Sequence, residues 1–171
     1  MKKIITLLAA VALSISFLSA QNARRAVGDK SFDLGIGINL TNGYSIMFPP
    51  IDASFEYTVL DFGTAGTLSA AGVASFGMDK YKSVNVSSFF VGPQAVYRFP
   101  IMDNLDLFGK VAIGYCSITA GNDIYKSLID HKGFAWCAYA GATYYFSEKM
   151  GVGLQFGNGL STAELHLTIR L

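Results

Sequence analysis

The stretch VGPQAVYRFPIMDNLDLFGKVAIGYC, residues 91–116, contains two alternating segments separated by a short polar turn. In each segment, apolar side chains occupy every second position, and mainly small or polar residues lie between them. An alternation with a period of two places one kind of residue on each face of a β-strand. The stretch therefore predicts a β-hairpin, with strands over about residues 86–99 and 105–116.

The same alternation extends over the rest of the chain from residue 31 to the end. It predicts six further strands, over residues 31–40, 52–59, 67–76, 134–146, 150–157 and 162–171. Longer connections at 41–50, 77–85 and 117–132 separate these strands on one side of the sheet, and shorter ones on the other. Asn158 and Gly159 fit a two-residue hairpin turn that would pair Gly157 with Leu160. With no amphipathic helix and no linker, the pattern predicts one all-β domain of eight antiparallel, up-and-down strands.

The composition of the 171-residue chain separates it from ordinary soluble domains. Hydrophobic residues make up 51% of the sequence and charged residues 15%, against about 25% charged in soluble domains. This much apolar surface excludes a disordered chain, and 13 basic against 12 acidic residues argue against a nucleic-acid-binding surface. Beyond the N-terminus, no apolar run approaches the roughly 20 residues of a membrane helix. The composition favours strands that face lipid.

The first residues follow the plan of a secretory signal peptide. Lys2 and Lys3 precede an apolar stretch over residues 4–18, and small residues follow up to Ala20. We therefore expect a cleaved signal peptide at 1–20, a periplasmic N-terminal segment at 21–30 and the barrel domain at 31–171.

The two faces of the predicted strands differ in a way that indicates which one meets lipid. Glycines gather on the polar face, which fits the crowded interior of a narrow closed barrel. Large aromatic residues lie on the apolar face in two bands, which are typical of the girdles of outer-membrane barrels. One band lies beside the short turns and the other toward the longer loops: Tyr57, Tyr97, Phe99, Tyr144 and Phe146, then Phe76, Phe89, Tyr115, Phe134 and Trp136. The alternative is a secreted soluble barrel with these aromatics in its core.

From residue 31 to the end, the chain resembles the small outer-membrane β-barrel family of OmpX-like and OmpA-transmembrane-like proteins. The resemblance rests on residues 91–116, where a strand ending in Tyr-x-Phe, an Asp-Asn turn and Phe-Gly-Lys-x-x-x-Gly-Tyr follow one another. Residues 141–157 repeat this plan, and the C-terminal LHLTIRL resembles the signal read by the barrel assembly machinery, with Leu171 in place of the usual Phe. The resemblance implies an eight-stranded transmembrane barrel in the cell outer membrane, with periplasmic termini and the longer loops outside.

The inward-facing positions carry a nearly balanced set of charges. An eight-stranded barrel is just wide enough for its interior to be filled by side chains, and an unpaired buried charge is costly. The set therefore predicts a lumen charge network: Asp33, Glu56, Arg98, Asp106, Lys110, Glu164, His166 and Arg170. Arg98 and Asp106 would face each other if the turn between them is centred on Met102. The network could plug the lumen, or it could form a gate or proton path.

Cys116 and Cys137 are the only cysteines, and export would place them where disulfides persist. Both occupy inward-facing positions on consecutive predicted strands. If that hairpin is symmetric about residues 126 and 127, the two lie directly opposite each other and could form a disulfide. The alternative is two buried free thiols.

No catalytic constellation emerges from the sequence. His166 occupies an inward-facing position and has no Ser beside it. The two histidines do not show the spacing of metal ligands. The glycines do not form a phosphate-binding loop. We therefore predict no catalytic, cofactor-binding or metal-binding residues, and an integral outer-membrane barrel without catalysis. It would support the outer membrane or interact through extracellular loops, with membrane lipid, the assembly machinery and an unknown surface partner as contacts, and no nucleic acid. The alternatives are a lipid-modifying enzyme, a narrow porin-like channel and the secreted soluble barrel.

Overall fold

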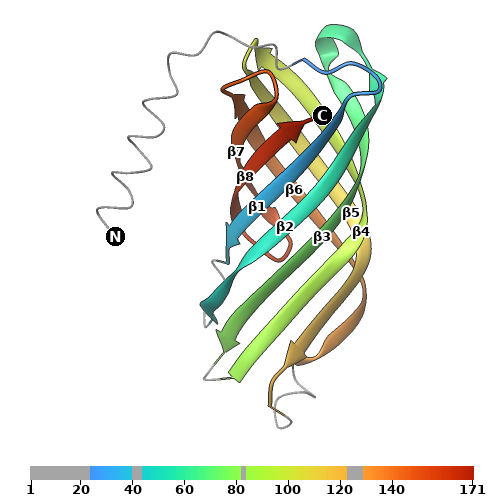
Figure 1. The fold of residues 1–171 in the computed structure, drawn as a ribbon. Coiled ribbons are helices and arrows are strands. Elements are labelled where there is room, and N and C mark those ends of the chain that lie inside the picture. Colours follow the sequence, from blue (N-terminus) through green and yellow to red (C-terminus); the bar gives the residue numbers. More distant parts are fainter. Residues whose placement is uncertain (1–23, 40–43, 82–83, 123–128) are drawn as a thin grey trace, which may run out of the picture.

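The computed structural model describes residues 24–39, 44–81, 84–122 and 129–171, and in it the chain forms a closed barrel of eight strands. The strands follow one another around the barrel in chain order (Figure 1). They are β1 (Lys30–Ile38), β2 (Tyr44–Asp61), β3 (Thr67–Tyr81), β4 (Val84–Met102), β5 (Leu105–Ala120), β6 (His131–Tyr145), β7 (Met150–Asn158) and β8 (Ala163–Arg170). The predicted fold class is confirmed. The predicted signal peptide at 1–20 lies outside the described residues.

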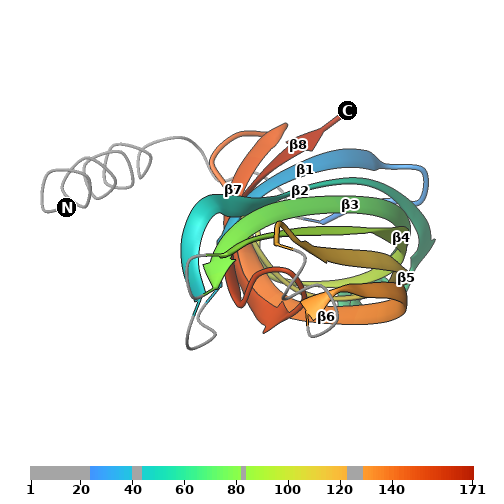
Figure 2. The ribbon, with the colours of Figure 1, turned by 90° about the horizontal axis from the view of Figure 1, so that it is seen from below.

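Every neighbouring pair of strands is antiparallel, and β1 closes the barrel by pairing with β8. The closing register runs from Ser31 opposite Arg170 to Ile38 opposite Ala163. Figure 2 shows the resulting ring of strands from one end. A short 3-10 turn, η2 (Gly63–Ala65), joins β2 to β3. The described part of the chain contains no helix of the length and apolar character needed to cross a membrane.

The predicted faces of the strands are confirmed. Along β2, Glu56 is 1% exposed, whereas its neighbour Tyr57 is 41% exposed. The same holds in β5, where Lys110 is buried and Val111 is 53% exposed. Mainly polar side chains therefore fill the interior, with a smaller number of apolar ones such as Phe90 and Phe108, and apolar side chains cover the outside. This is the reverse of a soluble barrel. Eight of the ten girdle residues are among the exposed large hydrophobic residues: Tyr57, Tyr97, Phe99, Phe76, Phe89, Tyr115, Phe134 and Trp136.

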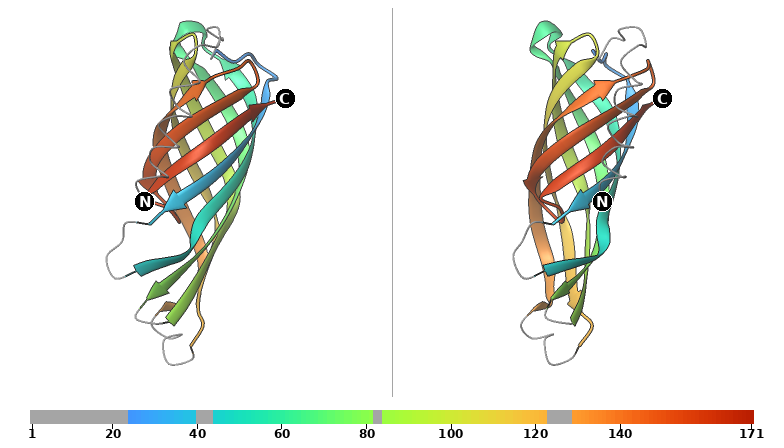
Figure 3. Two further views of the ribbon diagram at one scale, coloured as in Figure 1. Left: turned by 60° about the vertical axis from the view of Figure 1, so that its left-hand side comes forward. Right: turned by 90° about the vertical axis from the view of Figure 1, so that its left-hand side faces the viewer.

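The strands are unequal in length, and five of them, β2 to β6, are longer than the sequence predicted by two residues or more. β2 and β4 have 18 and 19 residues, whereas β1, β7 and β8 have 9, 9 and 8. Strand pairing continues into the predicted loops 41–50, 77–85 and 117–132, for example where Ser87 lies opposite Thr119. Alternation does not reveal this extension, because both faces are polar or mixed there. One side of the barrel wall, formed by β2 to β6, therefore extends farther at the end away from the C-terminus, which is the lower end in Figure 3.

The β7–β8 hairpin has a longer turn than predicted. Gln155 lies opposite Glu164, and the Gly157 amide donates to the Thr162 carbonyl at 3.0 Å. Residues 158–161 therefore form the turn, so the predicted pairing of Gly157 with Leu160 is wrong. The register differs by two residues, which keeps each side chain on its predicted face.

β4 and β5 approach each other closely where two inward-facing glycines meet. A Cβ on Gly92 would lie 2.0 Å from the Ile113 carbonyl oxygen and 2.7 Å from the Gly114 Cα. A side chain cannot move these backbone atoms aside, so glycine is required here, as at the sharply curved points of a small barrel.

Candidate functional site

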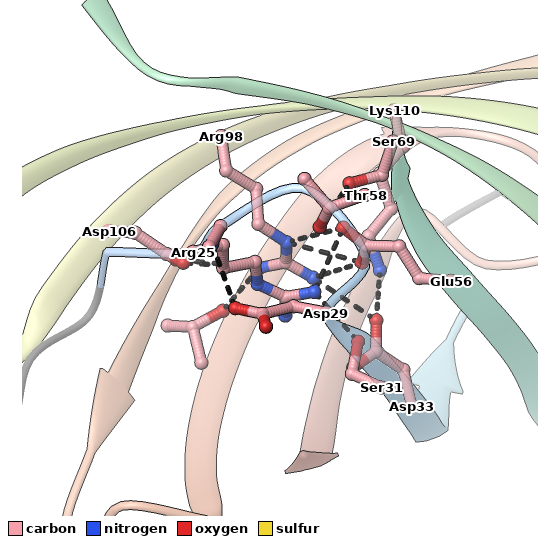
Figure 4. A network of polar contacts seen from close by, with 12 residues as sticks. Arg25, Asp29, Ser31, Asp33, Glu56, Thr58, Ser69, Arg98, Asp106 and Lys110 are labelled. Carbon is pink, nitrogen blue, oxygen red and sulfur yellow. Dashed lines mark hydrogen bonds and ion pairs between the residues drawn. The ribbon is translucent and has the colours of Figure 1, made fainter. Parts of the chain in front are cut away.

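Arg98 lies at the centre of an ion network inside the lumen (Figure 4). The network lies toward the end of the barrel that holds the C-terminus. Its Nε and Nη2 donate to the Glu56 carboxylate, with Nε to Oε1 at 3.0 Å and Nη2 to Oε2 at 2.8 Å. Its Nη1 lies 3.4 Å from both Asp106 oxygens, and its Nη2 lies 3.3 Å from Asp33 Oδ2. One guanidinium from β4 thus joins carboxylates from β1, β2 and β5.

Two further cations complete this lumen plug. The Lys110 Nζ lies 3.2 Å from Asp33 Oδ2. The Arg25 Nη1 lies 3.1 Å from Glu56 Oε1. All members are at most 3% exposed, and they form a balanced set of three cations and three anions: Arg25, Arg98, Lys110, Asp33, Glu56 and Asp106. Charges this deeply buried are stable only when paired and hydrogen-bonded.

The sequence missed Arg25, which it placed in a periplasmic segment outside the barrel. Residues 25–29 lie against the barrel end, where the Gly28 amide donates to the Thr58 carbonyl and the Thr58 amide donates to the Asp29 carbonyl, both at 2.9 Å. Gly28 has φ of 96°, a conformation that favours glycine. The turn directs Arg25 inward, where it also donates to Ser31 Oγ at 2.8 Å and to the Tyr145 hydroxyl at 3.2 Å. Arg25 precedes the first strand, so strand alternation does not predict which way its side chain faces. Only the Gly-Asp turn signal could have indicated that Arg25 enters the lumen.

Arg98 and Asp106 meet in a different way from the one predicted. The register places Arg98 opposite Phe108 and Asp106 opposite Pro100, so the turn is centred one residue later than Met102. The long Arg98 side chain reaches Asp106 diagonally. The guanidinium also lies over the Phe108 ring, 5.2 Å from its centroid.

The other three predicted network residues lie in the lumen but make other contacts. His166 Nε2 lies 3.2 Å from Thr143 Oγ1, and the His166 ring packs edge-on against Phe108. The Arg170 guanidinium lies over the Tyr145 ring at 4.0 Å. Glu164 forms none of the described ion pairs. It accepts hydrogen bonds from Gln155 Nε2 at 2.8 Å and Ser161 Oγ at 2.9 Å.

Cys116 and Cys137 are both buried free thiols. Cys137 lies opposite Ala112, and Cys116 lies opposite Gly133. The two cysteines are therefore four residues apart along the strands, about 13 Å at 3.3 Å per residue, beyond the 7 Å Cα limit for a disulfide. The prediction that they are direct cross-strand neighbours is wrong, because the hairpin is symmetric about a point two residues earlier than assumed.

Beyond the plug, toward the end away from the C-terminus, the lumen contains a partly open cavity of about 160 Å³, which we call the outer cavity. Its polar lining is Asp52, Ser75, Gln94, Tyr139, Gln155, Asn158 and Glu164. Its apolar lining includes Val73, Phe90, Cys116, Ile118, Cys137 and Leu160. In the described part of the chain, no group of three or more His, Cys, Asp or Glu side chains is placed to hold a metal ion.

The chain is similar in fold to solved membrane barrels. A de novo designed transmembrane β-barrel aligns with a TM-score of 0.52 and 14% identity, over 86% of this chain and 99% of that chain. Ail, the attachment invasion locus protein of Yersinia pestis, aligns with a TM-score of 0.50 and 10% identity, over 85% and 96%. The N-terminal β-barrel domain of Pseudomonas aeruginosa OprF aligns with a TM-score of 0.49 and 18% identity, over 84% and 99%. At such identities, the first two likenesses show the fold alone.

None of the curated proteins matches the chain significantly. The sequence does match the family described as "Outer membrane protein beta-barrel domain" over residues 9–164. That match covers most of the sequence, and the closed barrel with apolar outer and polar inner faces agrees with it. The chain therefore belongs to the outer membrane protein beta-barrel domain family.

Proposed function

We propose that this protein is a solute-tight, non-catalytic barrel that supports the outer membrane and interacts with a partner at the cell surface. The observation that carries the proposal is the lumen plug. Arg98 holds carboxylates from three strands together across the interior, and Arg25 joins it from the N-terminal segment. Because every member is buried and paired, opening a path for solutes would break several charge-assisted hydrogen bonds at once. This argues against a porin-like channel.

The unequal wall supports a role in surface interaction. β7 and β8 have the 8–9 residues that barely cross a bilayer as tilted strands, for which about 9–11 are needed. β2, β4 and β5 have 16–19 residues, so they extend past the hydrocarbon region. With both termini and the short turns in the periplasm, the high side of the wall would project from the cell. Its projecting strands and loops would meet the extracellular partner, while the aromatic girdles contact membrane lipid and the assembly machinery inserts the barrel.

The absence of catalysis is part of the proposal. His166 is 2% exposed, and its ring is held between Thr143 and Phe108, so a substrate at the membrane surface could not reach it. An enzyme would need a base and a nucleophile that the substrate can contact.

Two measurements test the proposal. In planar bilayers, the purified barrel should show no sustained large conductance, whereas a variant with Arg98 and Lys110 both replaced by Ser should conduct more or fail to insert. An epitope inserted after Asn122 should be labelled on intact cells, and one inserted between Asp103 and Asn104 only after the outer membrane is permeabilised. Steady conductance by the wild type, or the reverse labelling pattern, would refute the proposal.

A further inference from the structure

The outer cavity holds two neighbouring carboxylates. A Cβ on Gly35 would lie 2.0 Å from Glu164 Oε1 and 2.1 Å from Asp52 Oδ1. The two carboxylate oxygens therefore lie close to each other. No Lys or Arg is among the described residues that line this cavity. Lys110, in the plug below, already contacts Asp33. Two carboxylates, which are hydrogen-bond acceptors, therefore lie together in this cavity, and no cationic side chain is among its described lining residues.

Two buried amide groups add acceptors that have no partner. Gln94 is 7% exposed and Gln155 is 2% exposed, and both line the outer cavity. The Oε1 atom of each has no hydrogen-bond partner in the structure. Gln155 donates through Nε2 to Glu164, which fixes its orientation and leaves the oxygen end unused. Buried acceptors without partners are unusual in a folded protein, and they mark a place where a donor belongs.

The cavity also has an apolar part, which matches a small hydrocarbon group. Phe90, Cys116 and Cys137 are each at most 7% exposed and belong to one buried cluster with Val73. The cavity volume of about 160 Å³ is close to the roughly 150 Å³ of an apolar cavity that accepts benzene. A bare metal ion would leave this apolar wall without contacts.

We propose that the outer cavity binds a small organic cation, namely a primary ammonium on an apolar group about the size of benzene. The three N–H donors of the ammonium would meet the carboxylates of Asp52 and Glu164 and an unpartnered glutamine oxygen. The apolar group would pack against Phe90 and the two thiols. Because the plug fills the lumen below, the cation enters and leaves by the same end, so the cavity binds and does not conduct.

Titration of the full mature barrel in detergent micelles, followed by calorimetry or NMR, tests this inference with benzylammonium, benzyl alcohol and benzoate as probes. Benzylammonium should bind saturably and at least about tenfold more tightly than benzyl alcohol, and benzoate should not bind. Asp52→Asn and Glu164→Gln should each weaken benzylammonium binding about tenfold. Glu148→Gln, in the exposed turn after β6, is the matched control and should change nothing.

The cavity thiols give a second measurement. Saturating benzylammonium should slow the alkylation of Cys116 and Cys137 by a small neutral reagent at least about threefold, and benzoate should not. Faster migration of unboiled samples on gels would show that each variant is folded, and Gln94→Leu replaces any acidic variant that is not. Equal binding of benzylammonium and benzyl alcohol, no saturable binding, or full affinity in folded variants would overturn the inference. None of these outcomes would change the conductance or surface labelling that test the proposed function.

Discussion

At the end of the barrel that holds the C-terminus, three buried carboxylates meet three buried cations, whereas the described lining of the outer cavity has two carboxylates and no cation. Both regions lie inside the same eight strands. In the plug, long cationic side chains on β4, β5 and the N-terminal segment reach carboxylates on three strands. In the outer cavity, the facing positions on β4, β5 and β6 carry Gln94, Phe90, Cys116 and Cys137. The lumen is therefore closed where its charges are compensated and open where acceptors remain.

Breaking the plug at its centre should have the largest effect. Arg98→Met leaves Glu56, Asp106 and Asp33 with fewer cations, and we expect a loss of about 5 kcal/mol in the free energy of unfolding. Lys110→Met leaves Asp33 only partly uncompensated, because Arg98 still contacts it. We therefore expect a smaller loss in the free energy of unfolding, about 3 kcal/mol. Urea unfolding in lipid vesicles, followed by the fluorescence of the single Trp136, measures both. An unchanged midpoint for Arg98→Met would show that the plug is not a dry ion network.

A change in the barrel wall separates steric from charge effects. Gly92→Ala places a methyl group against the Ile113 carbonyl, and we expect a loss of about 3 kcal/mol because backbone cannot move away cheaply. Gly72→Ala is the matched control, since a Cβ there meets nothing within 4 Å. The control should be neutral or slightly stabilising. Urea unfolding midpoints of the two variants provide the measurement. Equal effects of Gly92→Ala and Gly72→Ala would contradict the close approach of β4 and β5 at Gly92.

The two adjacent arginines of the N-terminal segment test how far the plug extends. Arg25→Gln removes the ion pair with Glu56 and the hydrogen bonds to Ser31 and Tyr145. About 2 kcal/mol of the free energy of unfolding should be lost, since Arg98 still compensates Glu56. Arg24→Gln changes a side chain that is about half exposed, 3.6 Å from Asp61, and should shift the midpoint little. Thermal denaturation of both variants in micelles is the measurement. Identical shifts would mean that Arg25 does not belong to the plug.

The smallest effect is expected at the cysteines. Because the register separates Cys116 from Cys137, alkylation before and after reduction should modify both thiols equally, and the unfolding midpoint should not depend on a reductant. Mass spectrometry of non-reduced peptides provides the check. A peptide pair linked by a disulfide in protein from the native membrane would show that the strand register is different there.

The predictions of which face each residue occupies (its parity) are confirmed, whereas the predictions of which residues lie opposite each other (the register) are wrong at several turns. Parity depends only on which side of a strand a residue faces, and Glu56, Arg98 and Lys110 are buried as predicted. Register depends on where the chain turns, and the sequence misplaced the turns next to Met102, Gly157 and Cys116. A two-residue slip preserves the face of every side chain, so alternation cannot detect it.

The sequence by itself indicated the class of the protein, because alternation, aromatic bands and low charge together favour a closed barrel in lipid over a soluble barrel. It also selected which charges lie inside. Only the tertiary structure decided which of them pair, that Arg25 joins them from outside the strands, and that Gln94, Gln155, Asp52 and Glu164 line one cavity. The physical reason is that these contacts cross the lumen between residues far apart in the chain. Their distances depend on closure, register and side-chain reach, which no local pattern contains.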